Sequence, residues 1–254
     1  MNVQTIERPR AAAPSTASGE RAYFACRGLD AYYGDSYIVQ QVSFALEKGQ
    51  ILALLGRNGA GKTSTLRAIA RASSPHLARG EVWLDGVALH GKPNYVAAQA
   101  GIQLVQEDRR IIPGLTVEQN LQLATITGKK GWSFERIYQL FPRLAERRKQ
   151  EGVTMSGGEQ QMLAIARALA RDVKLLLLDE PYEGLAPVVR QDIAKALMEV
   201  RAAGITSIIV EQNAVAALKL SDRAVILDTG EVVFDGSAEE VLGNDDLMHR
   251  YLAI

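Results

Sequence analysis

A glycine-rich segment at residues 56–63 carries a lysine and a threonine at spacings suited to binding phosphate groups. It lies between the apolar run 51–55, a predicted strand, and a predicted helix. Glycines let backbone N–H groups approach phosphate oxygens, and the positive end of the following helix attracts the anion. Lys62 is predicted to reach the β- and γ-phosphates, and the Thr63 hydroxyl to ligate Mg²⁺. The residues predicted to contact a nucleotide here are Gly56, Asn58, Gly59, Ala60, Gly61, Lys62, Thr63 and Ser64.

Two carboxylates, Asp179 and Glu180, stand at the end of the apolar run 175–178. Acidic side chains at the carboxyl end of a parallel strand face the crevice where open α/β sheets bind ligands. Asp179 is predicted to hold Mg²⁺, and Glu180 to orient or deprotonate an attacking water molecule. A surface turn is the alternative for this pair, and the phosphate loop upstream disfavours it.

Residues 156–160, Ser-Gly-Gly-Glu-Gln, predict the start of another helix whose first turn could bind an anion. Serine is a good N-cap, and two glycines leave the backbone N–H groups bare. On its own the segment would be an ordinary helix start. One fold cannot easily aim two helix ends at one γ-phosphate, so this segment is predicted to serve the nucleotide of another subunit. Its predicted contacts are Ser156, Gly157, Gly158 and Glu159.

Alternating strands and helices must position these groups. Apolar runs at 51–55, 175–178 and 208–210 with its neighbours have the lengths of buried strands, and the last predicts a strand over 205–210. One predicted helix begins at Ser156, and a second covers residues 188–203. Such alternation predicts an α/β fold with a mostly parallel sheet covered on both faces.

Other regions depart from this alternation. Residues 42–46 alternate apolar with polar or small side chains, which predicts a strand with one buried face. Residues 116–171 hold mainly helical patterns, and residues 225–234 predict a hairpin. Residues 1–20 contain few large apolar side chains and predict a disordered tail.

Composition excludes several classes of function. The 254-residue chain has 29 basic and 29 acidic residues, so no overall field draws it to nucleic acid, which is not expected as a partner. The lone Cys26 cannot form an internal disulfide and is expected to be a small buried strand residue. No apolar run approaches the ~18–20 residues needed to cross a bilayer. A partner must therefore hold the protein at any membrane where it works.

The order of these motifs resembles the ATP-binding subunit of an ABC transporter over roughly residues 21–240. The phosphate loop, the signature at 155–159 and Asp179-Glu180 stand in family order, with Met155 where the family usually has leucine. The resemblance implies an α/β P-loop NTPase core with a mostly parallel sheet, an antiparallel β subdomain and an inserted helical subdomain. The implied division is a single ABC ATPase domain, 21–254, with a nucleotide-binding core, 21–106 and 172–254, and a helical subdomain, 107–171.

The resemblance also assigns roles to individual residues. Tyr33 matches the aromatic that stacks on adenine, with a plain core or surface tyrosine as the alternative. The glutamine that the family uses near the metal matches Glu107, with Gln106 beside it. Gln212 stands where the family has a switch histidine, so it joins Glu180 and Lys62 as the implied catalytic residues. Glutamine can donate to a γ-phosphate but cannot accept a proton, which leaves open whether this half-site hydrolyses ATP.

Together with Arg109-Arg110 and residues 182–187, these departures resemble the LivF-type ATPases of branched-chain, or hydrophobic, amino acid importers. This implies a subunit that binds and hydrolyses ATP with Mg²⁺ to power such an importer. The implied partners are a paralogous second ATPase subunit in a sandwich dimer, two integral-membrane permease subunits and, indirectly, a solute-binding protein. The implied location is the cytoplasmic face of the inner membrane, as a peripheral protein. Permease docking is expected at 107–116, where an ordinary buried loop is the alternative.

Other functions stay open at this point. Relatives of the LivF type carry urea, short amides or aromatic acids. A soluble ABC-type protein is less favoured, because DNA-repair members carry a long coiled coil that has no room here and ribosome-acting members carry two cassettes. A P-loop kinase or GTPase would give no reason for residues 156–160, and no Asn-Lys-x-Asp guanine motif occurs.

Overall fold

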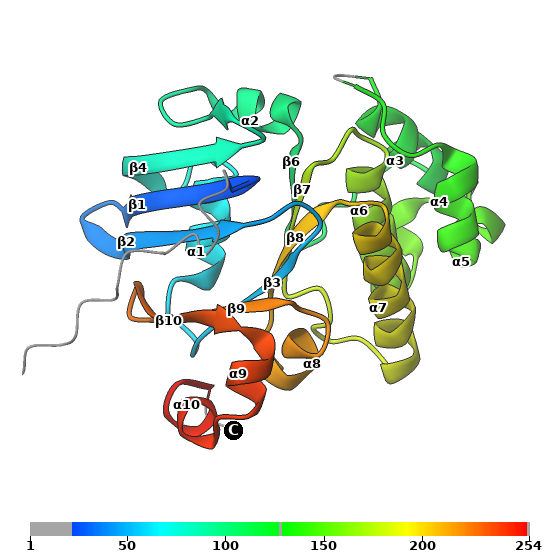
Figure 1. Cartoon of the computed structure of the whole chain (residues 1–254). Helices are drawn as coiled ribbons and strands as arrows, with labels where there is room; N and C mark the ends of the chain where they lie inside the picture. Colours follow the sequence, from blue (N-terminus) through cyan, green and yellow to red (C-terminus); the bar gives the residue numbers. More distant parts are fainter. Residues whose placement is uncertain (1–21, 127–128, 253–254) are drawn as a thin grey trace, which may run out of the picture.

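The computed structural model describes residues 22–126 and 129–252, and the predicted disordered tail at 1–20 lies outside them. The described chain forms a central six-stranded sheet and a separate four-stranded sheet (Figure 1). The four-stranded sheet lies on one side of the central strands, and a group of helices lies on the other (Figure 1).

The central sheet is mostly parallel, as the alternating pattern predicts. Its order is β10-β9-β3-β8-β7-β6, and β10 alone pairs antiparallel, with β9. Parallel neighbours need crossover connections, which place helices on the faces of the sheet. The strands are β3 (Ile51–Leu55), β6 (Ile102–Val105), β7 (Leu175–Asp179), β8 (Thr206–Val210), β9 (Arg223–Asp228) and β10 (Glu231–Ser237).

The middle strands are buried on both faces, which explains their nearly unbroken apolar sequence. Along β7, Leu175 and Leu177 join the core that also contains the four-stranded sheet. Leu176 and Leu178 join the core on the opposite face, beneath helices α6 (Gly157–Leu169) and α7 (Pro187–Ala202). Because side chains alternate along a strand, each leucine enters one of the two cores.

The four-stranded sheet is antiparallel and covers one face of the central sheet together with α1 (Lys62–Ile69). Val42, Phe44 and Leu46 are buried there, which confirms the strand predicted at 42–46. Cys26 is also fully buried, as predicted. The strands, in the order β2-β1-β4-β5, are β2 (Ser36–Leu46), β1 (Phe24–Tyr33), β4 (His76–Leu84) and β5 (Val87–Ala88).

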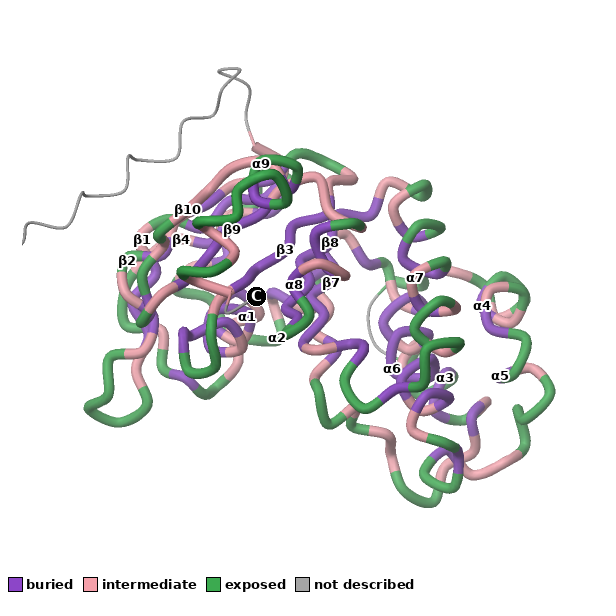
Figure 2. The backbone as a smooth tube through the Cα atoms, turned by 90° about the horizontal axis from the view of Figure 1, so that it is seen from below, coloured by how far each residue is buried: buried purple, intermediate pink, exposed green. Residues whose placement is uncertain are grey.

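Short helices fill the segment between β6 and β7, and capping side chains fix where they start. Thr116 caps α3 and Ser133 caps α4, while Pro142 is the first residue of α5. Figure 2 shows continuous burial in β3, β7 and β8, in contrast to the exposed turns of α5. These helices, with the one before β6, are α2 (Asn94–Ala100), α3 (Val117–Ala124), α4 (Phe134–Leu140), α5 (Pro142–Glu146), a 3₁₀ turn η1 (Gly152–Thr154) and α6.

The C-terminal third returns to the central sheet. The hairpin predicted at 225–234 is confirmed as β9 and β10. The remaining helices are α8 (Ala214–Leu218), α9 (Ala238–Leu242), α10 (Asp245–Leu247) and a π-helical turn η2 (Met248–Leu252). Within the described ranges, no helix combines the length and apolar character needed to span a membrane.

Candidate active site

The candidate site lies where four neighbouring strands of the central sheet end at one edge. β3, β8, β7 and β6 are adjacent and parallel, so their carboxyl ends meet. β3 leads into Gly56, β6 into Gln106 and β8 into Glu211, while Asp179 is the last residue of β7. Crevices at this edge are where open α/β sheets bind ligands. The topology thus brings the glycine-rich loop and the acidic pair to one place.

Lys62 points back into the loop from the start of α1. Its Nζ donates to the carbonyl oxygen of Gly56 at 2.8 Å and to that of Arg57 at 3.1 Å. The side chain is only 6% exposed. Burial lowers the pKa of Lys62, although the charges of Glu180 and Asp179 oppose that shift. The contacts hold the ammonium group inside the loop, where phosphate oxygens are expected.

Two glycines of the loop are required by close backbone approaches. Gly56 has a φ of 142°, and a Cβ there would lie 2.3 Å from the carbonyl oxygen of Leu227. Gly61, the N-cap of α1, has a φ of 97°, and its Cβ would lie 2.9 Å from the carbonyl oxygen of Ile38. A larger residue at either position would push the loop away from the backbone that supports it.

Thr63 and Asp179 form the oxygen pair predicted for Mg²⁺. Thr63 Oγ1 donates to Asp179 Oδ1 at 2.8 Å, while Asp179 Oδ2 is buried without a hydrogen-bond partner among the described residues. Burial raises the pKa of Asp179, and the Thr63 hydrogen bond opposes the rise. A partnerless carboxylate oxygen beside a hydroxyl fits a hard cation that prefers oxygen ligands. Residues 22–126 and 129–252 contain no metal-binding cluster of three or more His, Cys, Asp or Glu.

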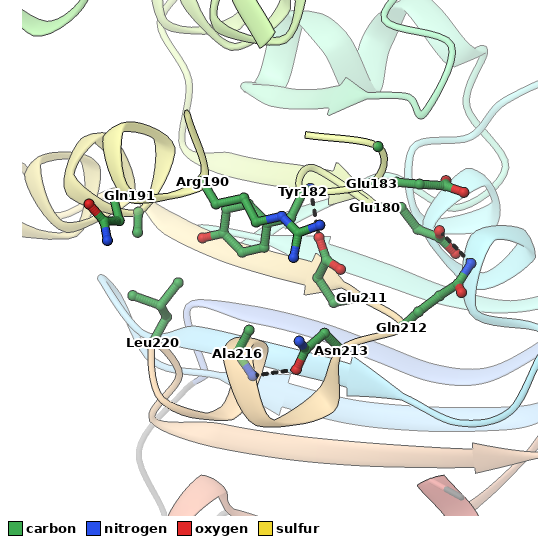
Figure 3. A pocket seen from close by; sticks show the side chains of 12 residues that line it. Glu180, Tyr182, Glu183, Arg190, Gln191, Glu211, Gln212, Asn213, Ala216 and Leu220 are labelled. Atoms are coloured by element: carbon green, nitrogen blue, oxygen red, sulfur yellow. Dashed lines mark hydrogen bonds between the residues drawn. The ribbon is translucent and has the colours of Figure 1, made fainter. Parts of the chain in front are cut away.

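Glu180 has an unusual backbone conformation directly after β7. Its φ is 49°, in the left-handed region that residues other than glycine seldom adopt. Its N–H donates to the carbonyl oxygen of Val210 at 2.9 Å, which ties it to the end of β8. Gln212 Nε2 donates to Glu180 Oε2 at 2.9 Å (Figure 3). The structure thus brings together the carboxylate and the amide that the sequence singled out.

Helix α6 begins with a capping box formed by Ser156 and Glu159. Ser156 Oγ accepts the Glu159 N–H at 3.3 Å, and Glu159 Oε2 accepts the Ser156 N–H at 3.0 Å. Burial alone would raise the pKa of Glu159, but the bonds from Ser156 and the charge of Arg147 outweigh it and lower the pKa. Glu159 therefore stabilises the first turn of α6 as a buried, ionised member of the capping box. The three atoms nearest to a Cβ on Gly157 would belong to the guanidinium of Arg109, the closest at 3.2 Å.

Helices α1 and α6 pack on opposite faces of the central sheet. Leu66 and Ile69 of α1 belong to the core that contains the four-stranded sheet. Leu163 and Leu169 of α6 belong to the core on the other face. Figure 1 shows the two helices separated by the strands of the central sheet.

Three more predicted residues lie around this edge. Tyr33 ends β1, is 37% exposed and accepts a 3.5 Å hydrogen bond from Arg67 Nη1 of α1. Gln106 and Glu107 directly follow β6. Burial is the main cause of the raised pKa of Asp179, and the negative charge of Glu107 raises it further. The Glu107 carboxylate therefore lies near the Asp179 carboxylate.

Comparison of the sequence with known proteins identifies the family to which this site belongs. The ABC transporter family matches residues 39–183, more than half of the chain. The chain is 42% identical over 227 residues to the high-affinity branched-chain amino acid transport ATP-binding protein BraG of Pseudomonas aeruginosa, spanning 88% of this chain and 97% of the relative.

The chain belongs to the ABC transporter family. It is also 35% identical over 221 residues to the probable branched-chain amino acid transport ATP-binding protein LivF of Archaeoglobus fulgidus, spanning 85% of this chain and 93% of the relative. The resemblance to ABC ATP-binding subunits of the LivF type is therefore confirmed. The chain carries the ATPase cassette of this family.

Solved ABC cassettes have the same fold. A nucleotide-free ATP-binding cassette from an ABC transporter aligns with a TM-score of 0.79 at 22% identity, covering 92% of this chain and 99% of that one. The dimeric bacterial ABC transporter cassette MJ0796 aligns with a TM-score of 0.73 at 23% identity, covering 85% and 98%. At these identities the likeness establishes the fold alone. The predicted fold class is confirmed.

Sequence reasoning missed Glu211 in this ABC cassette. Its side chain is 4% exposed, and its Oε1 accepts the N–H of Tyr182 at 2.8 Å (Figure 3). Burial raises the pKa of Glu211 to about 7, while the backbone hydrogen bond of Tyr182 opposes the rise. The signal that could have revealed it is a glutamate directly after the buried strand β8. In the sequence, such a glutamate is more simply interpreted as the first exposed residue of a turn.

A second missed feature is an arginine-lined cavity of about 190 Å³ between β6, α3 and α6. Its apolar floor includes Val105 and Ala168. Arg167 Nε is buried and has no hydrogen-bond partner in the described part of the chain, and burial lowers the pKa of Arg167. The arginines that line the cavity are Arg109, Arg110, Arg167 and Arg171.

Proposed function

We propose that this cassette is the ATP-binding and ATP-hydrolysing subunit that powers an ABC importer for branched-chain or other hydrophobic amino acids. The observation that supports this most is the 42% identity to BraG, a branched-chain amino acid transport protein, over nearly all of both chains. An ATPase subunit need not contact the solute. An importer of urea, short amides or aromatic acids is therefore the alternative, and a soluble non-transport ABC-type ATPase is less favoured.

The phosphate loop binds the triphosphate in this proposal. Lys62 exchanges the carbonyl oxygens of its own loop for those of the β- and γ-phosphates, and bare N–H groups at the start of α1 hold the remaining oxygens. Thr63 and Asp179 would hold Mg²⁺, with Gln106 and Glu107 beside them, and the ion would neutralise phosphate charge.

Glu180 and Gln212 act on the hydrolytic step in this proposal. Glu180 orients the attacking water and accepts its proton, and its bonds to β8 fix where it stands. Gln212 donates to the γ-phosphate or, as in the structure, to Glu180. Because an amide takes up no proton, Gln212 contributes position and polarity only.

We further propose that two cassettes, the second a paralogue, clamp ATP between them. The start of α6 would reach the γ-phosphate held by the partner, with Gly157 and Gly158 presenting N–H groups and Glu159 holding the N–H of Ser156 in the helix cap. The opposed positions of α1 and α6 support this arrangement. Closure would drive the permeases, and hydrolysis would release the clamp.

The proposed division of the cassette follows its motifs. The nucleotide-binding core comprises 21–106 and 172–254, and the helical subdomain comprises 107–171. The helices α3, α4, α5 and α6 all lie within the latter range, and all six strands of the central sheet lie within the former.

Two permease subunits and, indirectly, a solute-binding protein complete the proposed importer, which holds the cassette at the cytoplasmic face of the inner membrane. The proposed docking segment is 107–116, which borders the arginine-lined cavity. Ile111 packs against the core and Ile112 is half-buried, whereas Arg110 is exposed. The charge of the cavity favours an acidic segment on the permease.

Replacing Tyr33 with Ala tests its proposed stacking on adenine. We expect the Kd for ATP of the purified chain to rise about tenfold, because base stacking on an aromatic contributes ~1–3 kcal/mol. Isothermal titration calorimetry measures this directly. Tyr95→Ala, which removes an exposed tyrosine from α2, should leave the affinity unchanged. Equal affinities for wild type and Tyr33→Ala would remove Tyr33 from the site.

Replacing Gln212 with His tests whether a missing proton acceptor limits this half-site. We expect ATPase activity of the assembled complex to rise at least about threefold, a small share of the ~10²–10⁴ that a positioned acid or base contributes. Gln191→His makes the same change on an exposed residue of α7 and serves as the control. An unchanged rate would show that hydrolysis at this half-site is not limiting.

The proposed function is tested by isolating the native complex through a tag on this chain. We expect a paralogous ATPase and two permeases to copurify. After reconstitution into liposomes with the solute-binding protein, uptake of labelled leucine, isoleucine and valine should require ATP. Uptake of urea, short amides or aromatic acids instead would establish the alternative, and the absence of any permease would contradict the importer.

A further inference from the structure

Two hydrogen bonds fasten the chain that carries Glu180 to the end of β8. The Glu180 N–H donates to the Val210 carbonyl oxygen at 2.9 Å, and the Tyr182 N–H donates to Glu211 Oε1 at 2.8 Å. Gln212, the next residue, donates to the Glu180 carboxylate (Figure 3). Residues 210–212 therefore contact the Glu180 segment at three successive positions.

A carboxyl group is a costly choice for the middle of these three positions. Glu211 is 4% exposed, and a buried carboxyl loses its hydration unless it gains hydrogen bonds. The Tyr182 N–H that it accepts is itself buried, so this donor would be unsatisfied without Glu211. The pair closes one side of a cavity of about 380 Å³ whose opposite wall is formed by Ala216 and Leu220.

We propose that Glu211 is a positioning residue for Glu180, holding the Tyr182 amide so that the left-handed backbone at Glu180 keeps its carboxylate on the attacking water. This inference rests on the proposed catalytic role of Glu180. The φ of 49° at Glu180 is costly for a residue with a side chain and persists only where its surroundings enforce it. The hydrogen bonds that the Val210 carbonyl oxygen and the Glu211 carboxylate accept enforce it on both sides of the peptide that follows Glu180.

The ionisation of Glu211 gives this role a measurable signature. Burial raises its pKa to about 7, so it ionises near neutral pH, and an ionised carboxylate accepts an N–H more strongly than a neutral acid. We therefore expect turnover to rise as the pH passes through 7. The charged or titratable groups facing Glu211 are Glu180, Tyr182 and Glu183 of the loop after β7 and Arg190 of α7, while the α8 side offers the uncharged Asn213 and Ala216.

Glu211→Leu and Glu211→Gln in the assembled complex test the proposal. Leucine removes the acceptor, and we expect kcat to fall about 10- to 30-fold with the KM for ATP within about twofold, since catalysis is sensitive to small displacements of a catalytic group while the phosphate loop is unchanged. Glutamine keeps an oxygen for the Tyr182 N–H. We expect its kcat at pH 8 to stay within about threefold of wild type and its pH profile to lose the rise near 7.

Matched variants separate this role from a general loss of packing. Gln191→Leu alters the same cavity and should leave both kcat and the pH profile unchanged, whereas Glu183→Gln should keep the rise near pH 7. Wild-type turnover in Glu211→Leu, or a pH rise retained in Glu211→Gln, would overturn the proposal. Where Glu211→Leu does not fold, the pH profile of Glu211→Gln decides. Glu180→Gln, assayed in parallel, keeps its activity only if the proposed catalytic role is itself wrong.

Discussion

Replacing Glu180 with Gln lowers the ATP turnover of the assembled complex by at least about 10²-fold, the size of effect expected when a general base or water-orienting carboxylate is lost. The substitution changes one oxygen to an amide nitrogen and adds no bulk. The remaining carbonyl oxygen can still accept the hydrogen bond from Gln212, so the local geometry is preserved. What disappears is the ability to take a proton from water and the negative charge that orients it.

Equilibrium binding of ATP separates this loss from a loss of the nucleotide site. Glu180 follows β7 and makes no hydrogen bond to the phosphate loop among the described residues, so the Kd for ATP should stay within about threefold of wild type, or roughly 0.7 kcal/mol. Glu199→Gln makes the same chemical change on the exposed part of α7 and should leave turnover unchanged. Turnover of Glu180→Gln within a few-fold of wild type would contradict the proposed role.

Local signals in the sequence were sufficient for much of the fold. The apolar runs that became β3 and β7, and the apolar part of β8, are buried on both faces, so the strands could be recognised from hydrophobicity alone. The helix starts at Thr116 and Ser156 each carry a capping box that a four-residue window reveals. These elements are specified by interactions within a few residues, which is the range over which a sequence pattern acts.

The order of the strands depends on distant contacts instead. β3 lies between β8 and β9, which follow it by more than 150 residues, and no local pattern encodes that neighbourhood. β4 begins with His76, and its first residues are half-buried or exposed, so their periodicity is weak. Helix α2 has Pro93 at its N-cap position and no side-chain cap, which leaves it without a start signal.

In the site, too, some contacts follow from local sequence motifs and others depend on tertiary packing. The contact of Thr63 with Asp179 could be anticipated, because a phosphate loop and an acidic strand end specify both partners. Two other features could not be anticipated. Glu159 reads as part of an exposed signature, yet its carboxylate is buried in the helix cap. Glu211 reads as a turn residue, yet it is buried against Tyr182, because α7 and α8 close over the end of β8.

Replacing Gly157 with Asp is expected to abolish most turnover in the complex while leaving ATP binding by the purified chain unchanged. An aspartate in the first turn of α6 suits the helix dipole, so the fold should tolerate it. The atoms nearest to its Cβ would be those at the flexible end of Arg109. A carboxylate there would face the γ-phosphate held by the partner cassette, and repulsion of ~1–4 kcal/mol per charge pair at about 4 Å predicts a loss of about 10²-fold or more.

Gly157→Ala distinguishes charge from shape, because it adds the same Cβ without the carboxylate. We expect it to retain turnover within about fivefold of wild type, since a neutral surface change costs little.

The decisive comparison is between ATP binding by the purified chain and turnover of the complex. If the start of α6 completed the phosphate loop of its own chain, Gly157→Asp would weaken ATP binding by the purified chain as Lys62→Ala does. If the start of α6 completes the site of a second cassette, only Lys62→Ala weakens ATP binding by the purified chain. Gly157→Asp and Lys62→Ala then both abolish most turnover of the complex. The opposed faces on which α1 and α6 pack favour the second outcome.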